Sequence, residues 1–317
     1  MDTTMRAAVA ERPGPPEVLR VMDVPLPRLR PGWTSVQVRA FGVNRSELMT
    51  RQGHSPGARF PRILGIECVG IVAQSAALRQ GTTVAAVMGE MGRAFDGGYA
   101  EYALLPDSLL IPLTTTLDWA TLGAIPQAYL TALGSLAALA PADGGVLLVR
   151  GGSSSVGLAA LSLARDHGLR TIATTRNPAK AGLLLARGAG HVVVGQDRLP
   201  VRPDYILDLV GASTVAESLR LVAPGGTVCV AGTLGGAWTI PDFEPVAMIP
   251  SGTKLTAFHS DDLRGPAGAK ALQQIVDGVA EGRYDANLDR VFTLDEIADA
   301  HRYMEANQAT GKVVVRL

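Results

Sequence analysis

Residues 146–157 read VLLVRGGSSSVG, and this stretch decides the fold. Val146–Val149 is a short continuous apolar run, which is typical of a strand buried on both faces. A turn of small residues follows, and from Ser155 to His167 apolar residues recur at helical spacing. A strand, a small-residue turn and a helix start in this order are typical of a phosphate-binding site, because the amino end of a helix attracts an anion.

The turn fits a G-x-S-x-x-G pattern through Gly152, Ser154 and Gly157, with serine in place of the usual middle glycine. Serine is small enough for the backbone to approach a pyrophosphate closely, and its hydroxyl can donate to phosphate. We therefore expect Gly152, Ser154, Ser155, Val156 and Gly157 to bind a dinucleotide. A glycine- and serine-rich loop without a ligand is the other interpretation, and the next strand favours the dinucleotide.

The end of the second expected strand indicates which dinucleotide binds. NAD enzymes of this kind place an acid about 20 residues after the turn, where it binds the ribose hydroxyls. No carboxylate occurs between Asp166 and Asp197, and the strand ends in Thr175 and Arg176, with Lys180 one turn later. Arg176 and Lys180 would bind a 2′-phosphate, the guanidinium through two hydrogen bonds. We expect these three residues to select NADPH over NADH; a solvated pair of surface cations is the alternative.

Strands and helices alternate beyond the turn, which predicts a parallel sheet with helices on both faces. Residues before 117 instead contain short apolar runs separated by Gly and Pro, which predicts a β-rich barrel or sandwich. The fold class is therefore α/β, with a doubly wound parallel sheet of the Rossmann kind and a β-rich domain. The expected strands are Thr171–Thr174, His191–Val194, Tyr205–Val210, Thr227–Ala231, Lys254–Phe258 and Lys312–Arg316, and the expected helices lie in Leu117–Leu139, Pro178–Arg187, Ala212–Val222, Ala267–Glu281 and Leu294–Asn307.

Composition limits the classes of function. The 317 residues carry 29 basic and 29 acidic side chains, so neither nucleic acid nor an anionic membrane is an expected partner. Two cysteines, Cys68 and Cys229, can form neither a disulfide framework nor a four-thiolate zinc site. No apolar run reaches the roughly 20 residues of a membrane helix, and the first residues lack a signal-peptide core. We expect a cytoplasmic protein.

Motifs outside the turn point to one known family. They are Gly42–Glu47, Pro61–Gly70, Gly97–Tyr102, Asp208–Gly211 and, near the C-terminus, Ala300–Met304 with Gly311–Val314. With these motifs the chain resembles, over nearly its whole length, the medium-chain dehydrogenase/reductase superfamily, specifically its zinc-free quinone oxidoreductase-like branch. The resemblance implies a Rossmann NADPH-binding domain at residues 124–261, inserted in a GroES-like β-rich catalytic domain formed by residues 1–123 and 262–317. It also implies a homodimer through an edge strand, for which Lys254–Phe258 is the candidate.

The same resemblance bears on metal binding. Zinc-dependent members hold their catalytic zinc at positions that here carry Asn44, Ile66 and Gln127, and none of these offers a good zinc ligand. The four-cysteine structural lobe is missing as well, because no cysteine lies between Cys68 and Cys229. We expect no metal.

By resemblance, Asn44, Ser46, Gln127 and Thr131 form the catalytic set. Asn44 and Gln127 would hydrogen-bond a cofactor ribose or a substrate oxygen, Ser46 matches a proton-relay hydroxyl, and Thr131 would pack on the nicotinamide. Without the resemblance Asn44 is a turn asparagine, and Gln127 and Thr131 are polar groups of a helix that face a domain boundary. Met49 stands where relatives have a relay histidine or a tyrosine, which leaves the proton donor open.

Further positions are assigned to the cofactor. Arg45 matches a pyrophosphate contact, and a loop that follows the strand Thr227–Ala231 should run beside the nicotinamide. Glu67 lies inside an apolar run and should have a buried partner, with a catalytic role as the alternative. The remaining cofactor candidates are Gly232, Thr233, Leu234, Phe258 and Lys312.

These expectations define a function. The chain would transfer a hydride from NADPH, without zinc, to a small-molecule acceptor, either a quinone or an α,β-unsaturated carbonyl compound. The alternatives are an enoyl or 2-alkenal reductase of secondary metabolism and a relative that binds NADPH without catalysis.

Overall fold

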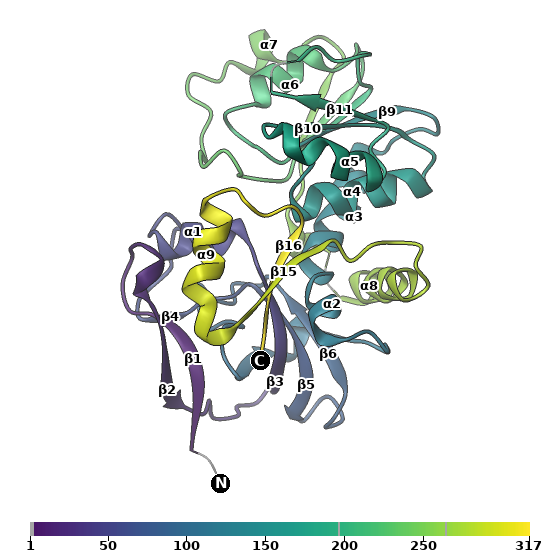
Figure 1. The fold of residues 1–317 in the computed structure, drawn as a ribbon. Coiled ribbons are helices and arrows are strands. Elements are labelled where there is room, and N and C mark those ends of the chain that lie inside the picture. Colours follow the sequence, from purple (N-terminus) through teal and green to yellow (C-terminus); the bar gives the residue numbers. More distant parts are fainter. Residues whose placement is uncertain (1–2, 196, 264) are drawn as a thin grey trace. The chain divides into compact units, whose positions relative to one another are not determined.

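The computed structural model describes residues 3–195, 197–263 and 265–317 (Figure 1). The chain forms two compact units. Met1–Gln127 and Leu263–Leu317 make up the first, which we call the β-rich unit. Ala128–Asp262 makes up the second, which we call the parallel-sheet unit.

Six strands of the described residues form the sheet of the parallel-sheet unit, in the order β11-β10-β9-β12-β13-β14, and every neighbouring pair is parallel. This is the Rossmann order, in which the chain starts at the centre, moves to one edge and returns to build the other half. The order reverses between β9 and β12, where ligands of such sheets bind at the carboxyl ends of the strands. The strands are β9 (Val146–Arg150), β10 (Arg170–Thr175), β11 (His191–Val194), β12 (Tyr205–Asp208), β13 (Thr227–Val230) and β14 (Lys254–Ala257).

Helices cover this sheet because its strands are apolar on both sides. α4 (Ser155–Asp166) packs on β9 and β10, and α6 (Val215–Leu221) packs on β12 and β13. Right-handed crossovers place α4 and α5 (Ala181–Ala186) on one face and α6 on the other. One apolar core of the unit consists of Val146, Leu148, Ile172, Val193, Ile206, Val215, Leu219, Val222 and Val228. The α/β class and the doubly wound parallel sheet are confirmed.

Several boundaries differ from the sequence expectation; the helix expected at Ala212–Val222, for example, is α6 from Val215 to Leu221. β12 ends at Asp208 instead of residue 210, because the Asp208 carboxylate accepts hydrogen bonds from the amides of Val210 and Gly211 and turns the chain. The helix expected at Pro178–Arg187 is a 3₁₀ turn, Pro178–Lys180, followed by α5. Leu117–Leu139 holds two helices, α2 (Trp119–Gly123) and α3, with a proline opening the second. α3 is Pro126–Leu139, and the short α7 is Pro245–Met248.

The β-rich unit contains two sheets. β1 (Thr4–Ala10) lies between β2 (Leu19–Pro25) and β4 (Arg62–Ile63) in the smaller one. The larger one has the order β15-β16-β3-β5-β6-β8, and β7 also pairs with β3. Its strands are β3 (Trp33–Val43), β5 (Glu67–Gln74), β6 (Thr83–Val87), β7 (Tyr102–Pro106), β8 (Leu110–Pro112), β15 (Leu288–Thr293) and β16 (Lys312–Arg316).

Both ends of the chain build the larger sheet. β16 pairs with β3 on one side and with β15 on the other, although β3 and β16 are separated by the whole parallel-sheet unit in sequence. β15 was not expected, because Leu288–Thr293 mixes charged and apolar residues and is exposed at four of its six positions. The helices of this unit are α1 (Arg45–Arg51), α2, α8 (Gly265–Ala280) and α9 (Ile297–Glu305), and Gln127 is the second residue of α3.

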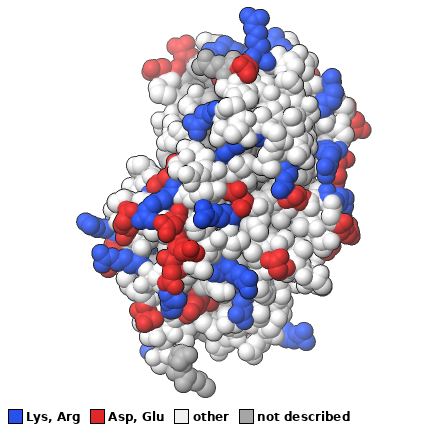
Figure 2. All heavy atoms as spheres, viewed as in Figure 1, with Lys and Arg blue, Asp and Glu red and all other residues white. Residues whose placement is uncertain are grey.

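Charge is spread over the visible face. Figure 2 shows lysine and arginine side chains interspersed with aspartate and glutamate, in keeping with a formal net charge of zero. In the part of the chain that the structure describes, no helix has the length and apolar character needed to span a bilayer.

Candidate functional site

The turn between β9 and α4 is built from backbone. A Cβ on Gly157 would lie 2.6 Å from the Gly151 carbonyl oxygen and 2.7 Å from that of Gly152, so only glycine fits. Gly152 faces β10, where a Cβ would lie 2.8 Å from Ala173 Cβ. Gly151 adopts φ +79°, which favours glycine. The structure therefore brings the expected phosphate-binding residues together in one closely packed turn at the start of α4.

Ser154 shapes this turn instead of reaching out of it. Its hydroxyl accepts a hydrogen bond from the Gly157 amide at 3.1 Å and donates to the Gly151 carbonyl at 2.8 Å. Ser154 is therefore the N-cap of α4. In this structure the one proton of the hydroxyl is used within the turn, and donation from Ser154 to phosphate stays a prediction.

The end of β10 lies against the same turn. Thr174 accepts a hydrogen bond from the Gly151 amide through its hydroxyl (3.2 Å) and another from the Gly152 amide through its carbonyl (3.0 Å). Thr175 is buried, Arg176 is exposed and Lys180 is half-buried in the 3₁₀ turn that follows. Sequence reasoning missed Thr174, although a threonine at the end of the second strand was visible. The two cations thus follow the strand next to the one that carries the phosphate-binding turn.

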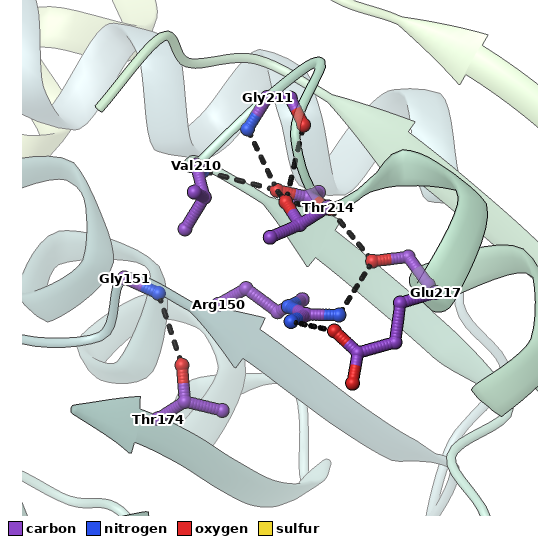
Figure 3. A network of polar contacts seen from close by, with 9 residues as sticks. Arg150, Gly151, Thr174, Val210, Gly211, Thr214 and Glu217 are labelled. Carbon is purple, nitrogen blue, oxygen red and sulfur yellow. Dashed lines mark hydrogen bonds and ion pairs between the residues drawn. The ribbon is translucent and has the colours of Figure 1, made fainter. Parts of the chain in front are cut away.

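A buried carboxylate braces the reversal point of the sheet (Figure 3). Asp208, fully buried at the end of β12, accepts hydrogen bonds from two backbone amides and from the hydroxyls of Thr214 and Ser218. Arg150, at the end of β9, donates to the Ser218 hydroxyl at 3.2 Å and pairs with Glu217. These contacts tie β9, β12 and α6 together just before the phosphate-binding turn begins.

Two further loops meet this region within the parallel-sheet unit. Gly232 packs on the backbone of Leu209, since a Cβ there would lie 2.3 Å from the Leu209 carbonyl oxygen. Leu234 reaches the turn, with its Cδ1 at 2.8 Å from where a Gly151 Cβ would be. Thr233 lies between them in sequence, so all three expected residues follow β13 at the carboxyl edge of the sheet.

Thr131 and Phe258 lie along α3 in the same unit. The Phe258 ring occupies the space in front of Gly134, where a Cβ would lie 2.0 Å from the ring. The Thr131 hydroxyl lies 2.9 Å from the Ser260 hydroxyl. Residues three apart share a helix face, so the two expected residues line the same side of α3.

The β-rich unit holds a buried polar cluster made of Asn44, Glu47, Glu67 and Lys312, each at most 8% exposed. We call it the Asn44 cluster. The Lys312 ammonium pairs with Glu67 Oε1 and donates to Asn44 Oδ1 at 2.5 Å. Asn44 Nδ2 donates to Glu67 Oε1 at 2.9 Å and to Glu47 Oε1 at 3.3 Å. Glu67 therefore has the buried partner that was expected, and it is Lys312.

The ammonium of Lys312 has two partners inside the β-rich unit, and its expected contact with the cofactor stays a prediction. Glu67 extends the cluster to the first turn of α3, because its Oε2 accepts a hydrogen bond from the Gln127 amide at 3.1 Å. Three of the expected residues, Asn44, Gln127 and Lys312, are thus linked through one carboxylate. Asn44 does not use its side chain to cap α1, which begins at the next residue.

Burial sets the electrostatics of this cluster. Removal from water raises the pKa of Glu47 to about 7, against the lowering effect of the hydrogen bond that its Oε1 accepts from the Ile66 amide. Among the described residues, Glu47 Oε2 has no hydrogen-bond partner. Below about pH 7, a protonated Glu47 beside the Glu67–Lys312 pair leaves the cluster without net charge.

The N-terminal turn of α1 carries two arginine contacts. Arg93, from the loop after β6, donates to the Ser46 hydroxyl at 2.5 Å, and Arg45 donates to Asn307 at 3.2 Å. Arg93 was missed because its loop carries no motif. A guanidinium that donates to a hydroxyl oxygen leaves the hydroxyl proton for another acceptor.

A second buried group occupies the other end of α1. Arg51 donates to His301 Nδ1 at 3.2 Å, so His301 carries its proton on Nε2, which lies 3.1 Å from the Tyr99 hydroxyl. Burial, with the nearby Arg51 charge, holds the pKa of His301 well below its usual value. Its neutral form packs α9 against the sheet.

Metal ligands do not gather in either unit. Within the ranges that the structure describes, no three or more His, Cys, Asp or Glu side chains form a group that could hold a metal ion. Ile66 lies buried beside the Asn44 cluster and contributes only an apolar side chain and the amide that binds Glu47.

Comparisons with known proteins agree with this architecture. The family model for an alcohol dehydrogenase GroES-like domain matches residues 30–115, and the model for a zinc-binding dehydrogenase matches residues 186–315. The quinone oxidoreductase of Homo sapiens is 29% identical over 335 residues, which cover 99% of this chain and 98% of that protein. The chain belongs to the medium-chain dehydrogenase/reductase superfamily, in its quinone oxidoreductase-like branch. The β-rich unit of this superfamily member is GroES-like.

Two other similarities add detail. A phenolphthiocerol/phthiocerol polyketide synthase of Mycobacterium tuberculosis is 29% identical over 334 residues, which cover 98% of this chain and 15% of that protein. The solved structure of mycobacterial Rv1454c complexed with NADPH matches with a TM-score of 0.87 at 25% identity, over 99% of this chain and 100% of that one. Together the comparisons support an oxidoreductase that uses a nicotinamide cofactor.

Proposed function

We propose that this chain is an NADPH-dependent oxidoreductase that transfers a hydride, without zinc, to a quinone or to the β-carbon of an α,β-unsaturated carbonyl compound. The observation that carries the cofactor choice is the pair Arg176 and Lys180, which follows β10 where an NAD-binding protein would place an acid. A guanidinium binds a phosphate through two hydrogen bonds, whereas a carboxylate there would repel it. The NADPH complex of the similar Rv1454c supports the same choice.

The turn after β9 suits the pyrophosphate. Three glycines, Gly151, Gly152 and Gly157, let the turn pack closely on itself and on its neighbours at points where a Cβ would collide. Ser155 and Val156 are the first residues of α4, and the first amides of a helix have no acceptor within it. These residues would hold the pyrophosphate, with Arg176 and Lys180 on the 2′-phosphate. When bound, NADPH supplies the hydride.

The donor set in the β-rich unit argues for chemistry without zinc. Asn44 and Gln127 offer amide groups and Ile66 offers none, whereas zinc in proteins takes thiolate, imidazole and carboxylate ligands. Without a metal to polarise a plain carbonyl, an acceptor already poor in electrons is favoured, such as a quinone or an enone. The quinone oxidoreductase relatives support the quinone.

Ser46 is the proposed proton donor. Its oxygen accepts the hydrogen bond from Arg93, so its own proton remains for the substrate, and the adjacent positive charge favours its release. Gln127 would bind the substrate oxygen on which negative charge develops, and Thr131 would pack on the nicotinamide. Arg93 thereby takes the place of the relay group that Met49 does not provide.

Enoyl-thioester reduction is the second candidate. The mycobacterial polyketide synthase aligns with nearly the whole of this chain over 15% of its own length, as an enzyme with a reductase module among its other domains would. A third possibility is binding of NADPH without catalysis.

Calorimetry tests the cofactor. Wild-type protein should bind NADPH at least about tenfold more tightly than NADH, because one charge-assisted contact contributes roughly 1.5–3 kcal/mol. Arg176→Ala should remove this preference, whereas Arg198→Ala, an exposed arginine of the same unit, should leave it unchanged. Equal affinity for both cofactors, or an Arg176→Ala variant that keeps the preference, contradicts the proposal.

Turnover tests the reaction. NADPH oxidation, followed by absorbance near about 340 nm, is measured with a panel of quinones, enones and enoyl thioesters. Turnover with quinones or enones supports the proposal, and turnover with enoyl thioesters alone supports the second candidate. Tight NADPH binding without turnover on any acceptor identifies a non-catalytic binder. Metal analysis of the active protein should find no stoichiometric zinc.

We also propose a cytoplasmic homodimer that pairs through β14. This strand is at the edge of its sheet and its side chains are exposed or half-buried, so its unpaired backbone can extend the sheet into a second copy. The two free thiols, Cys68 and Cys229, fit a reducing compartment. Light scattering on the full chain should give twice the 33.1 kDa mass. Ala257→Pro in β14 should return the monomer, because the neighbouring amides of Lys254 and Phe258 bond to β13 and the alternate amide of Ala257 faces the open edge.

A further inference from the structure

The hydrogen-bonding capacity of the Asn44 amide is almost entirely used. A side-chain amide has two donors and, on its oxygen, two acceptor positions. The Nδ2 donors go to Glu67 Oε1 at 2.9 Å and to Glu47 Oε1 at 3.3 Å, and the oxygen accepts from the Lys312 ammonium at 2.5 Å. What remains is one acceptor position on Oδ1.

The charges around the amide also fix which way it faces. If the amide were reversed, its NH₂ would point at the ammonium of Lys312 and its oxygen at the carboxylate of Glu67, and both contacts would become repulsive. The carboxylate and the ammonium are each 1% exposed, so no water screens these contacts. The buried ion pair therefore selects one of the two orientations.

From this geometry we propose that Glu67 and Lys312 are positioning residues that hold Asn44 as a hydrogen-bond acceptor, so that Asn44 binds a hydroxyl group of the cofactor or of the acceptor substrate and does not donate to a developing oxyanion. This inference rests on the proposed function and changes the part that Asn44 plays in it. Oxyanion stabilisation then falls to Gln127, whose backbone amide is held by the same Glu67.

Gly42 shows that the space for the pair is built into β3. A Cβ at this position would lie 2.2 Å from Lys312 Cε and 2.4 Å from Glu67 Oε1. The backbone of Gly42 does not have a positive φ, so its conformation allows alanine. The added Cβ would collide with the ion pair. Gly42→Ala thus shifts the pair while Glu67 and Lys312 are both retained.

The first experiment is a double-mutant cycle in activity. Glu67→Gln with Lys312→Met removes both charges together, and Asn44→Leu removes the amide at similar volume. Each should lower kcat/KM by about 10- to 100-fold, the equivalent of one hydrogen bond to a charged group. If the pair acts through Asn44, the triple variant loses no more than about twofold beyond Asn44→Leu, because coupled groups are not additive. Losses that multiply, or a Glu67→Gln/Lys312→Met protein as active as wild type, overturn the proposal.

The two possible sources of the hydroxyl are separated by binding measurements. If the cofactor provides it, Asn44→Leu weakens NADPH binding in calorimetry by about tenfold or more. If the substrate provides it, NADPH binding stays within about twofold, and the loss appears in the KM of a quinone that carries a hydroxyl group and not in the KM of the same quinone without it. If Asn44→Leu changes neither NADPH binding nor this KM, the proposal that Asn44 acts as a hydrogen-bond acceptor is contradicted.

A spectroscopic readout keeps the inference separate from the proposed function. The side-chain NH₂ signals of Asn44, identified by their loss in Asn44→Leu, should exchange slowly with solvent in wild type and at least about tenfold faster in Gly42→Ala. Gly182→Ala is the control, because a Cβ there meets nothing within 4 Å. Slow exchange in wild type with no NADPH turnover refutes the function and keeps the positioning, whereas fast exchange in wild type refutes the positioning itself.

Discussion

Replacing Lys312 by methionine should destabilise the β-rich unit more than any surface change. Methionine fills a similar volume but leaves the Glu67 carboxylate, 1% exposed, without its counter-ion. Removing one partner of a buried pair costs about 3–5 kcal/mol, because the remaining charge has neither water nor a partner. For a unit of this size each kcal/mol lowers Tm by about 2–4 °C, so we expect a fall of roughly 6–20 °C.

Adding Glu67→Gln should restore much of the free energy of unfolding that Lys312→Met removes. Glu67→Gln in the Lys312→Met background deletes the uncompensated charge, and replacing a buried pair by neutral groups is often close to neutral in free energy. We expect this double variant to recover at least about half of the lost free energy. Urea unfolding in a Trp238→Phe background, followed by tryptophan fluorescence, reports on the unit that contains the pair, because Trp33 and Trp119 both lie in it.

Lys270→Met is the matched control, because Lys270 is exposed on α8 of the same unit. It should change the free energy of unfolding by less than about 0.5 kcal/mol. A Lys312→Met protein within about 1 kcal/mol of wild type, or a double variant as unstable as the single one, would show that Glu67 is not held by this ion pair.

Three further predictions concern other positions. Gly157→Ala should weaken NADPH binding at least about tenfold in calorimetry, because its Cβ would meet two backbone carbonyls within 2.7 Å that cannot move aside; binding within twofold of wild type would refute the role of the turn. Glu47 has its pKa raised to about 7 in the folded protein from a usual 4.5, so its stabilising effect is complete below pH 4.5 and is lost as the pH rises through about 7. Glu47→Gln should therefore gain roughly 3 kcal/mol relative to wild type between about pH 5 and 8 in urea unfolding, and parallel pH profiles would contradict a neutral Glu47. Asp208→Asn should cost at least about 2 kcal/mol in the same assay, because the NH₂ group that replaces the fully buried Oδ2 cannot accept from the Thr214 and Ser218 hydroxyls; Glu217→Gln should cost less than about 1 kcal/mol, because Glu217 is 53% exposed, and equal costs would refute the bracing role of Asp208.

Local patterns in the sequence were sufficient for the parallel-sheet unit. The apolar run at Val146–Val149, the glycines of the turn and the alternation that follows are short-range signals, and they led to the correct class of fold. Gly157 was informative because a Cβ there would lie 2.6 Å from the Gly151 carbonyl oxygen, so no other residue type fits at this position. The capping role of Ser154 could not be predicted, since a hydroxyl in a turn can cap a helix as well as bind a ligand and sequence does not separate the two.

Long-range partners could not be predicted. Lys312 and Glu67 are 245 residues apart, and no local sequence pattern near either residue predicts that they pair. Arg93 lies in a loop without a motif, and its contact with Ser46 depends on how that loop folds over α1. β15 has no continuous apolar face, so its place in the sheet depends on pairing with β16. In each case the contact decides the role, and the contact exists only in the folded chain.

Because β16 pairs with β3, the larger sheet cannot be completed until β16 has been synthesised. The ribosome makes Glu67 early and the lysine that neutralises it 245 residues later. At about 5–20 residues per second this interval lasts roughly 12–50 s. During this time all of the parallel-sheet unit is made, and β3 of the larger sheet has no partner on the side where β16 will pair. Nascent chains of this protein should therefore depend on chaperones until their last strand emerges, and truncation just before β16 should yield a folded parallel-sheet unit attached to an aggregation-prone β-rich one.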